Sequence, residues 1–260
     1  MEPIEVAGAT WGDVRITAVT DATGQFFRPV REAFPAAPEA AWQKAREIDP
    51  AAFDGANEWR LQFRCFLVIS GSTTILVDAG IGPADSPAAP WAPVPGELPT
   101  RLGIDPAEID VVVLTHLHTD HIGWAAAPTY FPNARHVLQQ ADHDAVDELN
   151  PRLRHTLLDP LRAAGQLELV TGSAQIAAGV RVAHAPGHTP GHQVVLVESG
   201  RQTLAITGDA FVHAIQLADP SVAYILETDP EAAHQTRRRF LKEANTLATS
   251  HLTEPFHLVR

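Results

Sequence analysis

The stretch Thr115-His116-Leu117-His118-Thr119-Asp120-His121-Ile122-Gly123 is the most informative part of this sequence. It follows Asp110 to Leu114, a short apolar run typical of a buried strand. His116 and His118 are two residues apart, so at a strand end their side chains can point the same way. Asp120 and His121 are adjacent and must diverge, which suits a second metal or another side of the site. Because zinc and similar divalent metals accept imidazole and carboxylate ligands, the stretch predicts a metal site.

Three later segments add further candidate ligands. His188 lies between Pro and Gly residues on a tight turn after a predicted strand, whereas the nearby His192 is interpreted as a supporting or structural residue. Asp209 follows an apolar strand and fits as a carboxylate that bridges two metals. His251 directly follows a predicted strand, so we prefer it as a ligand to His257. We expect His257 to support the site from a second layer or to lie at its mouth.

Together these motifs make the chain resemble the metallo-β-lactamase superfamily. The resemblance rests on His-x-His-x-Asp-His at 116–121, followed in order by His188, Asp209 and His251, and covers residues 61–260. It implies that His116, His118 and His188 hold one metal, that Asp120, His121 and His251 hold another, and that Asp209 bridges them. The segment Leu76-Val77-Asp78-Ala79-Gly80 also resembles a family element, whose Asp supports the metal site from behind. Asp78 is therefore the candidate that fixes the tautomer of a ligating histidine.

A narrower resemblance is to the branch that contains lactonases and methyl-parathion-hydrolase-like enzymes. It rests on four short segments: Gly208 to His213 with Gln216, Thr236 to Arg238, His251-Leu252, and Pro255 to His257.

These resemblances imply a metal-dependent hydrolase with two divalent ions, zinc first, with Mn, Fe or Co as alternatives. Two such ions about 3.5–4 Å apart share a hydroxide that attacks the carbonyl carbon of an ester or lactone, an acyl-homoserine lactone among the candidates. Asp120 is the candidate catalytic residue, which orients the hydroxide and then passes a proton to the leaving alkoxide.

Several alternatives to this function stay open. The same site suits a thioesterase of the glyoxalase-II type or a phosphotriester hydrolase. The first is the weaker, because such enzymes carry a helical domain after the last metal histidine, and only nine residues follow His251. A non-catalytic metal-binding scaffold is the alternative from a different class, and a hydrolysis screen separates it from an enzyme.

The order of elements predicts an α/β fold. Strands expected at 14–19, 61–69 and 74–77 come first in pairs. Later strands, among them 167–170 and 180–184, alternate with helices, among them 151–163 and 230–243. This order favours a four-layer αββα sandwich with two mixed sheets and helices outside. We expect one domain over residues 1–260, with an N-terminal excursion at about 20–60 that forms a lid or a dimer contact. Residues 80–99 contain six prolines and are expected to form a long surface loop that borders the site.

Composition limits the partners that we expect. The formal net charge of −12 disfavours nucleic acid and anionic membranes, and no stretch of about 18 apolar residues suggests a membrane span. The single cysteine, Cys65, cannot form an internal disulfide, and the N-terminus does not resemble a signal peptide, so we expect a cytoplasmic protein. A small molecule is the expected substrate, with Phe211, His213 and Trp124 as candidates to bind it. Trp91 of the Pro-rich loop is a further candidate to line the pocket, and Phe26 and Phe27 could reach over the site from the N-terminal excursion. A homodimer is an open alternative to a monomer.

Overall fold

Two β-sheets packed face to face form the centre of the molecule. The computed structural model describes residues 7–55, 57–127 and 130–259. In the first sheet the strand order is β1-β2-β4-β5-β6-β7-β8, and the short β3 pairs with β4. The bounds of its strands are β1 Gly8–Trp11, β2 Val14–Gln25, β3 Phe53–Asp54, β4 Glu58–Ser70, β5 Thr73–Val77, β6 Val111–Val113, β7 Arg135–Gln139 and β8 Leu167–Val170.

The second sheet has the strand order β14-β13-β12-β11-β10-β9. Its strands are β9 Ser173–Ala177, β10 Val180–His184, β11 Gln193–Ser199, β12 Gln202–Ile206, β13 Thr246–Ala248 and β14 Phe256–Leu258. Both sheets are mixed, since β5 to β8 run parallel while β2 and β4 are antiparallel, and β12 and β13 are a parallel pair in an otherwise antiparallel sheet. The prediction of two mixed sheets is therefore confirmed.

Successive side chains along each central strand point to opposite faces of its sheet, and this alternation allows the sheets to pack on each other and on the outer helices. In β6, Val111 and Val113 lie in the core between the sheets, whereas Val112 faces the helices on the outer side. In β11, Val195 and Val197 face the same inter-sheet core, and the neighbouring residues face the outer helix α8. Because both faces of these central strands are buried, their sequences are almost continuously apolar.

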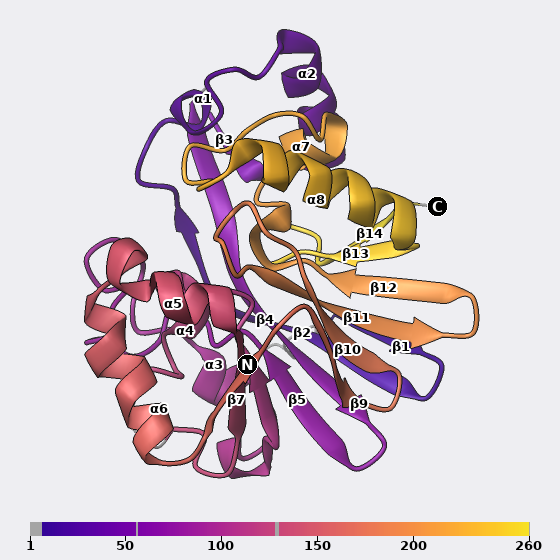
Figure 1. Ribbon diagram of the computed structural model, residues 1–260. Helices are drawn as coiled ribbons and strands as arrows, with labels where there is room; N and C mark the ends of the chain where they lie inside the picture. The colour runs from indigo at the N-terminus through magenta and orange to yellow at the C-terminus, as the bar shows by residue number, and fades with distance from the viewer. Residues whose placement is uncertain (1–6, 56, 128–129, 260) are drawn as a thin grey trace.

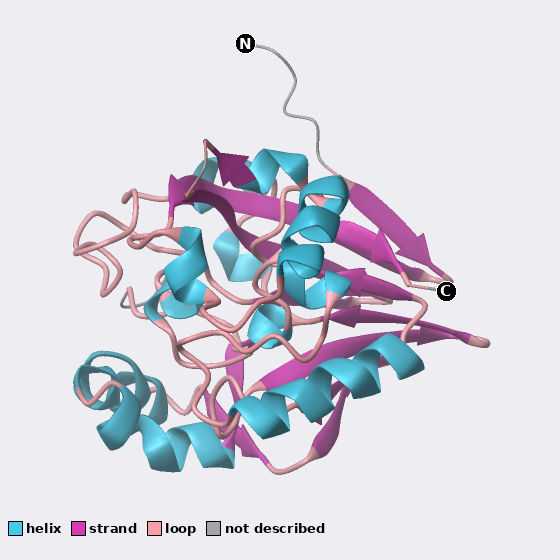
Figure 2. Ribbon diagram, turned by 90° about the horizontal axis from the view of Figure 1, so that it is seen from above, coloured by secondary structure: helices cyan, strands magenta, loops and turns pink. Residues whose placement is uncertain are grey.

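Helices cover the outer faces and the top of the sandwich. α5 and α6 lie beside the first sheet, α8 lies over the second, and α2 and α7 gather at the top (Figure 1). Seen from above, α8 runs along the outside of the strands (Figure 2). The helices are α1 Val30–Ala33, α2 Glu39–Ile48, α3 Leu98–Arg101, α4 Thr119–Ile122, α5 Gln140–Leu149, α6 Asp159–Ala163, α7 Ala214–Ala218 and α8 Pro230–Glu243. Among the described residues, no helix has both the length and the apolar character that crossing a bilayer requires.

The sequence located most central elements well and three of the edge strands poorly. β10, α8 and the edge strand β8 have the predicted bounds, whereas the strand expected at 14–19 extends to Gln25 and is preceded by β1. The edge strands β9 and β14 were not predicted, because an edge strand need not be continuously apolar. The helix expected at 151–163 is divided into a π-helical turn at Arg154–Leu158 and α6, where Pro160 lacks the backbone N–H of a regular helix.

The N-terminal excursion packs onto the second half of the chain. Its helix α2 contacts α7. Buried side chains of the excursion share one core cluster with Ala214 and Ile215 of α7. The loop expected at 80–99 has no regular element before α3. That the chain is one domain, and that the excursion acts as a lid or dimer contact, stay predictions.

Candidate metal centre

The residues predicted as ligands follow strands whose carboxyl ends meet at one edge of the sandwich. His116 and His118 come after β6, His188 after β10, Asp209 after β12 and His251 after β13. β10, β12 and β13 run in the same direction, because β11 is antiparallel to both of its neighbours and β12 is parallel to β13. Side chains far apart in sequence therefore converge on a common point.

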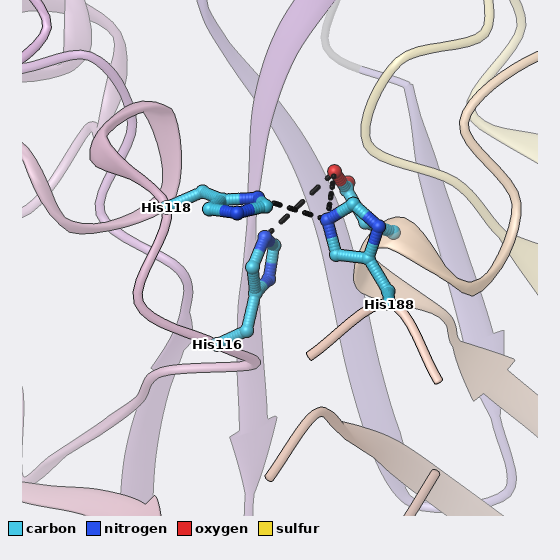
Figure 3. Close-up of side chains that lie close together, drawn as sticks. His116, His118 and His188 are labelled. Carbon is cyan, nitrogen blue, oxygen red and sulfur yellow. Dashed lines mark hydrogen bonds and ion pairs between the residues drawn. The ribbon is translucent and has the colours of Figure 1, made fainter. Parts of the chain in front are cut away.

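The first group contains His116, His118, His188 and Asp209. Figure 3 shows the three imidazole rings directed toward one another and toward the carboxylate. Nε2 of His188 lies 2.9 Å from Nδ1 of His118. Oδ2 of Asp209 lies 3.2 Å from Nε2 of His188 and 3.7 Å from Nε2 of His116.

The second group contains Asp120, His121 and His251. The Nε2 atoms of the two histidines are 3.2 Å apart, and Oδ2 of Asp120 lies 3.6 Å from each. The other carboxylate oxygen of Asp209, Oδ1, lies 3.1 Å from Nε2 of His121 and 3.0 Å from Nε2 of His251. The two oxygens of Asp209 thus face different groups, which is the arrangement that a bridging carboxylate requires.

The polar atoms of these two groups are arranged to bind divalent cations rather than to form hydrogen bonds with one another. Within each group the candidate ligand atoms lie within 4.8 Å of one another. Nε2 of His116 is buried and has no hydrogen-bond partner, although such atoms are normally paired. The donor set is imidazole nitrogen and carboxylate oxygen, which suits zinc, manganese, iron or cobalt.

Burial and charge set the protonation of the centre. Burial holds the pKa of His116 well below its usual value, and burial together with the nearby His188 lowers the pKa of His118 to about 3. Burial alone would raise the pKa of Asp209, but His121 and His251 hold it well below its usual range. His116 and His118 therefore present neutral imidazoles and Asp209 presents an ionised carboxylate, the forms that bind a metal.

A second layer of hydrogen bonds directs the ligand atoms. Asp78 accepts from Nδ1 of His121 at 2.8 Å and also from the backbone and hydroxyl of Thr115. Nδ1 of His251 donates to the carbonyl of Gln62 at 2.6 Å. These hydrogen bonds hold both imidazole rings with Nε2 directed at the centre. The placement of Asp78 agrees with its predicted supporting role.

His192 supports Asp209 rather than joining the ligands. Its Nδ1 donates to the carbonyl of Ala185 at 3.1 Å, and its Nε2 accepts from the backbone N–H of Asp209 at 3.0 Å. These contacts fix the backbone from which the Asp209 carboxylate projects.

Asp142 is a buried carboxylate that sequence reasoning missed. It lies on α5 and accepts from the hydroxyl of Thr189 at 2.9 Å, from the backbone N–H of Gly191 at 2.5 Å and from that of Leu117. Leu117 lies between His116 and His118, and Thr189 follows His188. The Asp142 carboxylate therefore connects the two loops that carry the histidines of the first group. A lone Asp in an exposed-looking helical segment gives no sequence signal of this role.

Asp21 is a second missed carboxylate, and it explains the position of Trp124. Asp21 accepts from the backbone N–H of Ile81 and Leu98, at 2.7 and 2.6 Å, and from the indole N–H of Trp124 at 3.1 Å. Trp124, a predicted substrate-binding residue, is 8% exposed and does not line the cavity described below. Its indole N–H is used to anchor the loops behind the metal centre.

Phe211 and His213 also lie away from the cavity. Phe211 packs in the core beneath α8, and His213 is enclosed by Phe34, Trp42, Phe53 and Trp59. Nδ1 of His213 accepts from the backbone N–H of Ile215 and caps α7. The prediction that these two side chains bind substrate is not supported by the structure, because both point into the core, while Val212 between them lines the cavity.

His257 lies on β14, outside the second layer of the site. It pairs with Leu247 of β13, and its Nε2 interacts with the carbonyl of Glu254 at 2.9 Å. It contacts no candidate ligand and does not line the cavity, so the predicted supporting role is not supported. The prediction relied on closeness in sequence to His251, but β14 carries His257 back along the sheet.

A cavity of about 390 Å³ opens onto the centre. Four candidate ligands line its floor, namely His118, Asp120, Asp209 and His251. The walls contain Phe26, Phe27, Trp59, Leu61, Trp91, Thr119, Leu149, Asn150, Val212, Tyr224 and Leu226. Phe26, Phe27 and Trp91, which the sequence offered as residues at the pocket, are among them, whereas Phe211, His213 and Trp124 are not.

A buried ion pair fixes one wall of this cavity. Arg237 of α8 is fully buried and forms an ion pair with Glu227, while its other nitrogens donate to the carbonyls of Pro220 and Val222 at 2.7 and 3.2 Å. The segment between these partners carries Tyr224 and Leu226. The contacts of Arg237 therefore hold in place the loop that brings Tyr224 to the cavity.

Comparison with known families gives a match over most of the chain. A model of the Metallo-beta-lactamase superfamily matches residues 60–251. An N-acyl homoserine lactonase of a Bacillus species is 32% identical over 99 residues, which are 38% of this chain and 37% of that protein. Metallo-beta-lactamase domain-containing protein 1 of Mus musculus is 32% identical over 197 residues, 73% of this chain and 66% of that protein. The chain thus spans well under half of the length of the first lactonase.

Solved structures share the fold over nearly the whole chain. The hydrolase AbOPH of the beta lactamase superfamily superposes with a TM-score of 0.78 at 25% identity, covering 96% of this chain and 91% of that one. AidC, a dizinc quorum-quenching lactonase solved with its product N-hexanoyl-L-homoserine, superposes with a TM-score of 0.76 at 21% identity, covering 97% and 92%. At that identity the second likeness concerns the fold alone.

Proposed function

The chain belongs to the metallo-beta-lactamase superfamily, and we propose that this metal-dependent hydrolase cleaves a carboxylic ester or a lactone. The observation that carries the proposal is the convergence of two ligand groups on either side of Asp209, at the floor of an apolar cavity. The lactonase relatives support the same class of bond.

In this proposal the seven converging residues would hold two divalent ions. His116, His118 and His188 would hold one, Asp120, His121 and His251 would hold the other, and Asp209 would be shared between them. Zinc is the proposed metal, as in the dizinc lactonase AidC that shares the fold, although manganese, iron and cobalt suit the same imidazole and carboxylate donors. When bound, the ions supply Lewis acidity that lowers the pKa of water and polarises the substrate carbonyl.

Asp120 is the proposed catalytic residue of the chain. Its carboxylate lines the cavity, so it can contact both the attacking water and the substrate. It accepts a proton from the water at Oδ2 and returns that proton to the oxygen of the leaving alkoxide. The acyl C–O bond breaks, a new acyl C–O bond to the water oxygen forms, and the products are an acid and an alcohol.

The test is a panel of esters, lactones, thioesters, phosphotriesters and β-lactams, assayed with protein stripped of metal and then reloaded with Zn²⁺, Mn²⁺ or Co²⁺. We expect hydrolysis of esters or lactones only after reloading. Full activity of the stripped protein, with its metal content checked by elemental analysis, would rule the proposal out. Turnover confined to thioesters or phosphotriesters would replace the proposed bond type while leaving the metal centre intact.

A further inference from the structure

Aromatic side chains form much of the wall above the candidate ligands. Five of the lining residues are aromatic, and they come from segments far apart in sequence: Phe26, Phe27, Trp59, Trp91 and Tyr224. We call these five residues the aromatic collar. The first two lie just beyond β2 and Trp59 lies in β4, while Trp91 belongs to the Pro-rich loop. A wall drawn from four segments indicates a property of the folded cavity rather than of one motif.

The collar is continuous and reaches the metal centre. The ring centroids of Phe26 and Phe27 are 4.3 Å apart, and those of Phe26 and Trp59 are 4.8 Å apart. Phe26 also lies 6.0 Å from Tyr224, and Phe27 lies 6.4 Å from Trp91. The ring of Tyr224 is almost parallel to that of His188, with an interplanar angle of 8° and centroids 6.1 Å apart. A group bound inside the collar would therefore meet aromatic faces and edges within reach of the candidate ligands.

The charges of the cavity favour a neutral substrate. Among the described residues that line it, none is Lys or Arg, and the floor contains the carboxylates of Asp120 and Asp209. The guanidinium of Arg28 packs over the ring of Phe27 at 5.6 Å but does not line the cavity. The indole N–H of Trp91 is already bound to the hydroxyl of Thr119 at 3.1 Å. An anionic group held between the aromatic rings, away from the two cations proposed at the floor, would thus be desolvated without a cationic partner.

We propose that the collar binds an uncharged aromatic ring of the substrate, in preference to an alkyl group of the same size. This inference rests on the proposed ester or lactone hydrolysis. An alkyl group would gain the same burial of apolar surface, so burial alone does not distinguish the two. The electric quadrupole of the aromatic ring distinguishes the two groups. Stacked and edge-to-face aromatic pairs bind roughly two- to tenfold more tightly than burial of the same apolar area alone would predict.

The first experiment measures binding without turnover. Ketone analogues, in which a methylene replaces the ester oxygen, are prepared with a terminal phenyl or cyclohexyl ring. Their dissociation constants are read from the fluorescence of Trp59 and Trp91 in metal-loaded protein. We expect the phenyl ketone to bind at least about threefold more tightly than the cyclohexyl ketone. Equal binding of the two, or tighter binding of the cyclohexyl ketone, would overturn the inference.

A variant locates the preference. Phe27→Leu keeps an apolar side chain at the rim, where Phe27 is 52% exposed, so the substitution does not threaten the fold. We expect the phenyl-to-cyclohexyl ratio to fall toward one. The matched control is Phe256→Leu, an aromatic side chain of β14 that does not line the cavity, and this variant should keep the wild-type ratio. An unchanged ratio in Phe27→Leu would argue against the collar as its source.

A hydrolysis arm separates failure of the inference from failure of the proposed function. Ethyl esters of 4-phenylbutyric, 4-cyclohexylbutyric and decanoic acid share ten acyl carbons, and we expect the phenyl ester to have the highest kcat/KM. Equal turnover of all three would overturn the aromatic preference and leave the esterase function standing. An aromatic preference in ketone binding, without hydrolysis of any ester or lactone, would support the collar and contradict the proposed function.

Discussion

The metal centre and the aromatic cluster around His213 both contain buried histidines, but only the histidines of the centre are arranged as candidate metal ligands. In the centre, imidazole nitrogens face one another and two carboxylates, and partners such as Asp78 orient the rings. His213 follows Asp209 by four residues, but its ring is enclosed by aromatic side chains and its Nε2 has no hydrogen-bond partner. Burial of a histidine is therefore weak evidence for a ligand, whereas convergence of several directed nitrogens is strong evidence.

The largest expected effect comes from breaking the convergence at Asp209. We predict that Asp209→Ala stays folded, binds fewer than two metal ions per chain and loses more than about a hundredfold in activity. The reason is that its two oxygens face different ligand groups, and loss of even an outer partner costs roughly 10–100-fold in metal affinity. Elemental analysis and circular dichroism check the prediction. Two tightly bound ions in the variant would contradict the bridging role.

A similar but smaller effect is expected from Asp142, which positions ligands without touching the metal. We predict that Asp142→Asn weakens metal binding by about tenfold, because an amide cannot accept from all three donors that the carboxylate binds. A titration against a competing chelator measures this affinity. The control is Asp144→Asn on the same helix, where the carboxylate is exposed. Equal affinities for the two variants would show that Asp142 has no positioning role.

The His213 cluster is expected to affect acid stability rather than metal binding. Burial, with a contribution from Arg46, lowers the pKa of His213 to about 3. Below pH 6.5 the unfolded chain therefore binds a proton at this residue that the folded protein does not bind. Stability from this group is therefore present above pH 6.5 and is lost as the pH falls toward 3. Between pH 7 and pH 5 the loss is about 2 kcal/mol.

His213→Asn tests this contribution, since its amide oxygen can still cap α7 while the side chain no longer titrates. We expect denaturant unfolding of the variant to lose less free energy between pH 7 and pH 5 than the wild type does, with unchanged metal content. The same pH dependence in both proteins would show that His213 is not the acid-sensitive group.

The smallest effect is expected from His257, which the structure places outside the site. We predict that His257→Ala changes metal content and kcat by no more than about twofold, as for other substitutions away from special features. Inductively coupled plasma analysis and steady-state kinetics check this expectation. A loss of one metal ion would restore His257 to the supporting layer.

The aromatic wall shows where sequence patterns stop being informative. The ligands could be named because each one follows a buried apolar run, and parallel strands bring their carboxyl ends to one edge. Phe211 and Trp124 also follow ligand-bearing segments, but their side chains point into the core. The residues that do form the wall, such as Phe26 and Tyr224, lie in segments with no motif at all.

The sequence by itself determined the two-sheet fold, the positions of the central strands along the chain and the identity of the seven converging side chains, because strand alternation and strand-end position are local rules. Only the tertiary structure decided which aromatic side chains surround the cavity and which buried carboxylates brace it. Those roles depend on packing between segments as distant as Asp21 and Trp124, or Asp142 and Gly191, whose contacts leave no periodic trace along the chain.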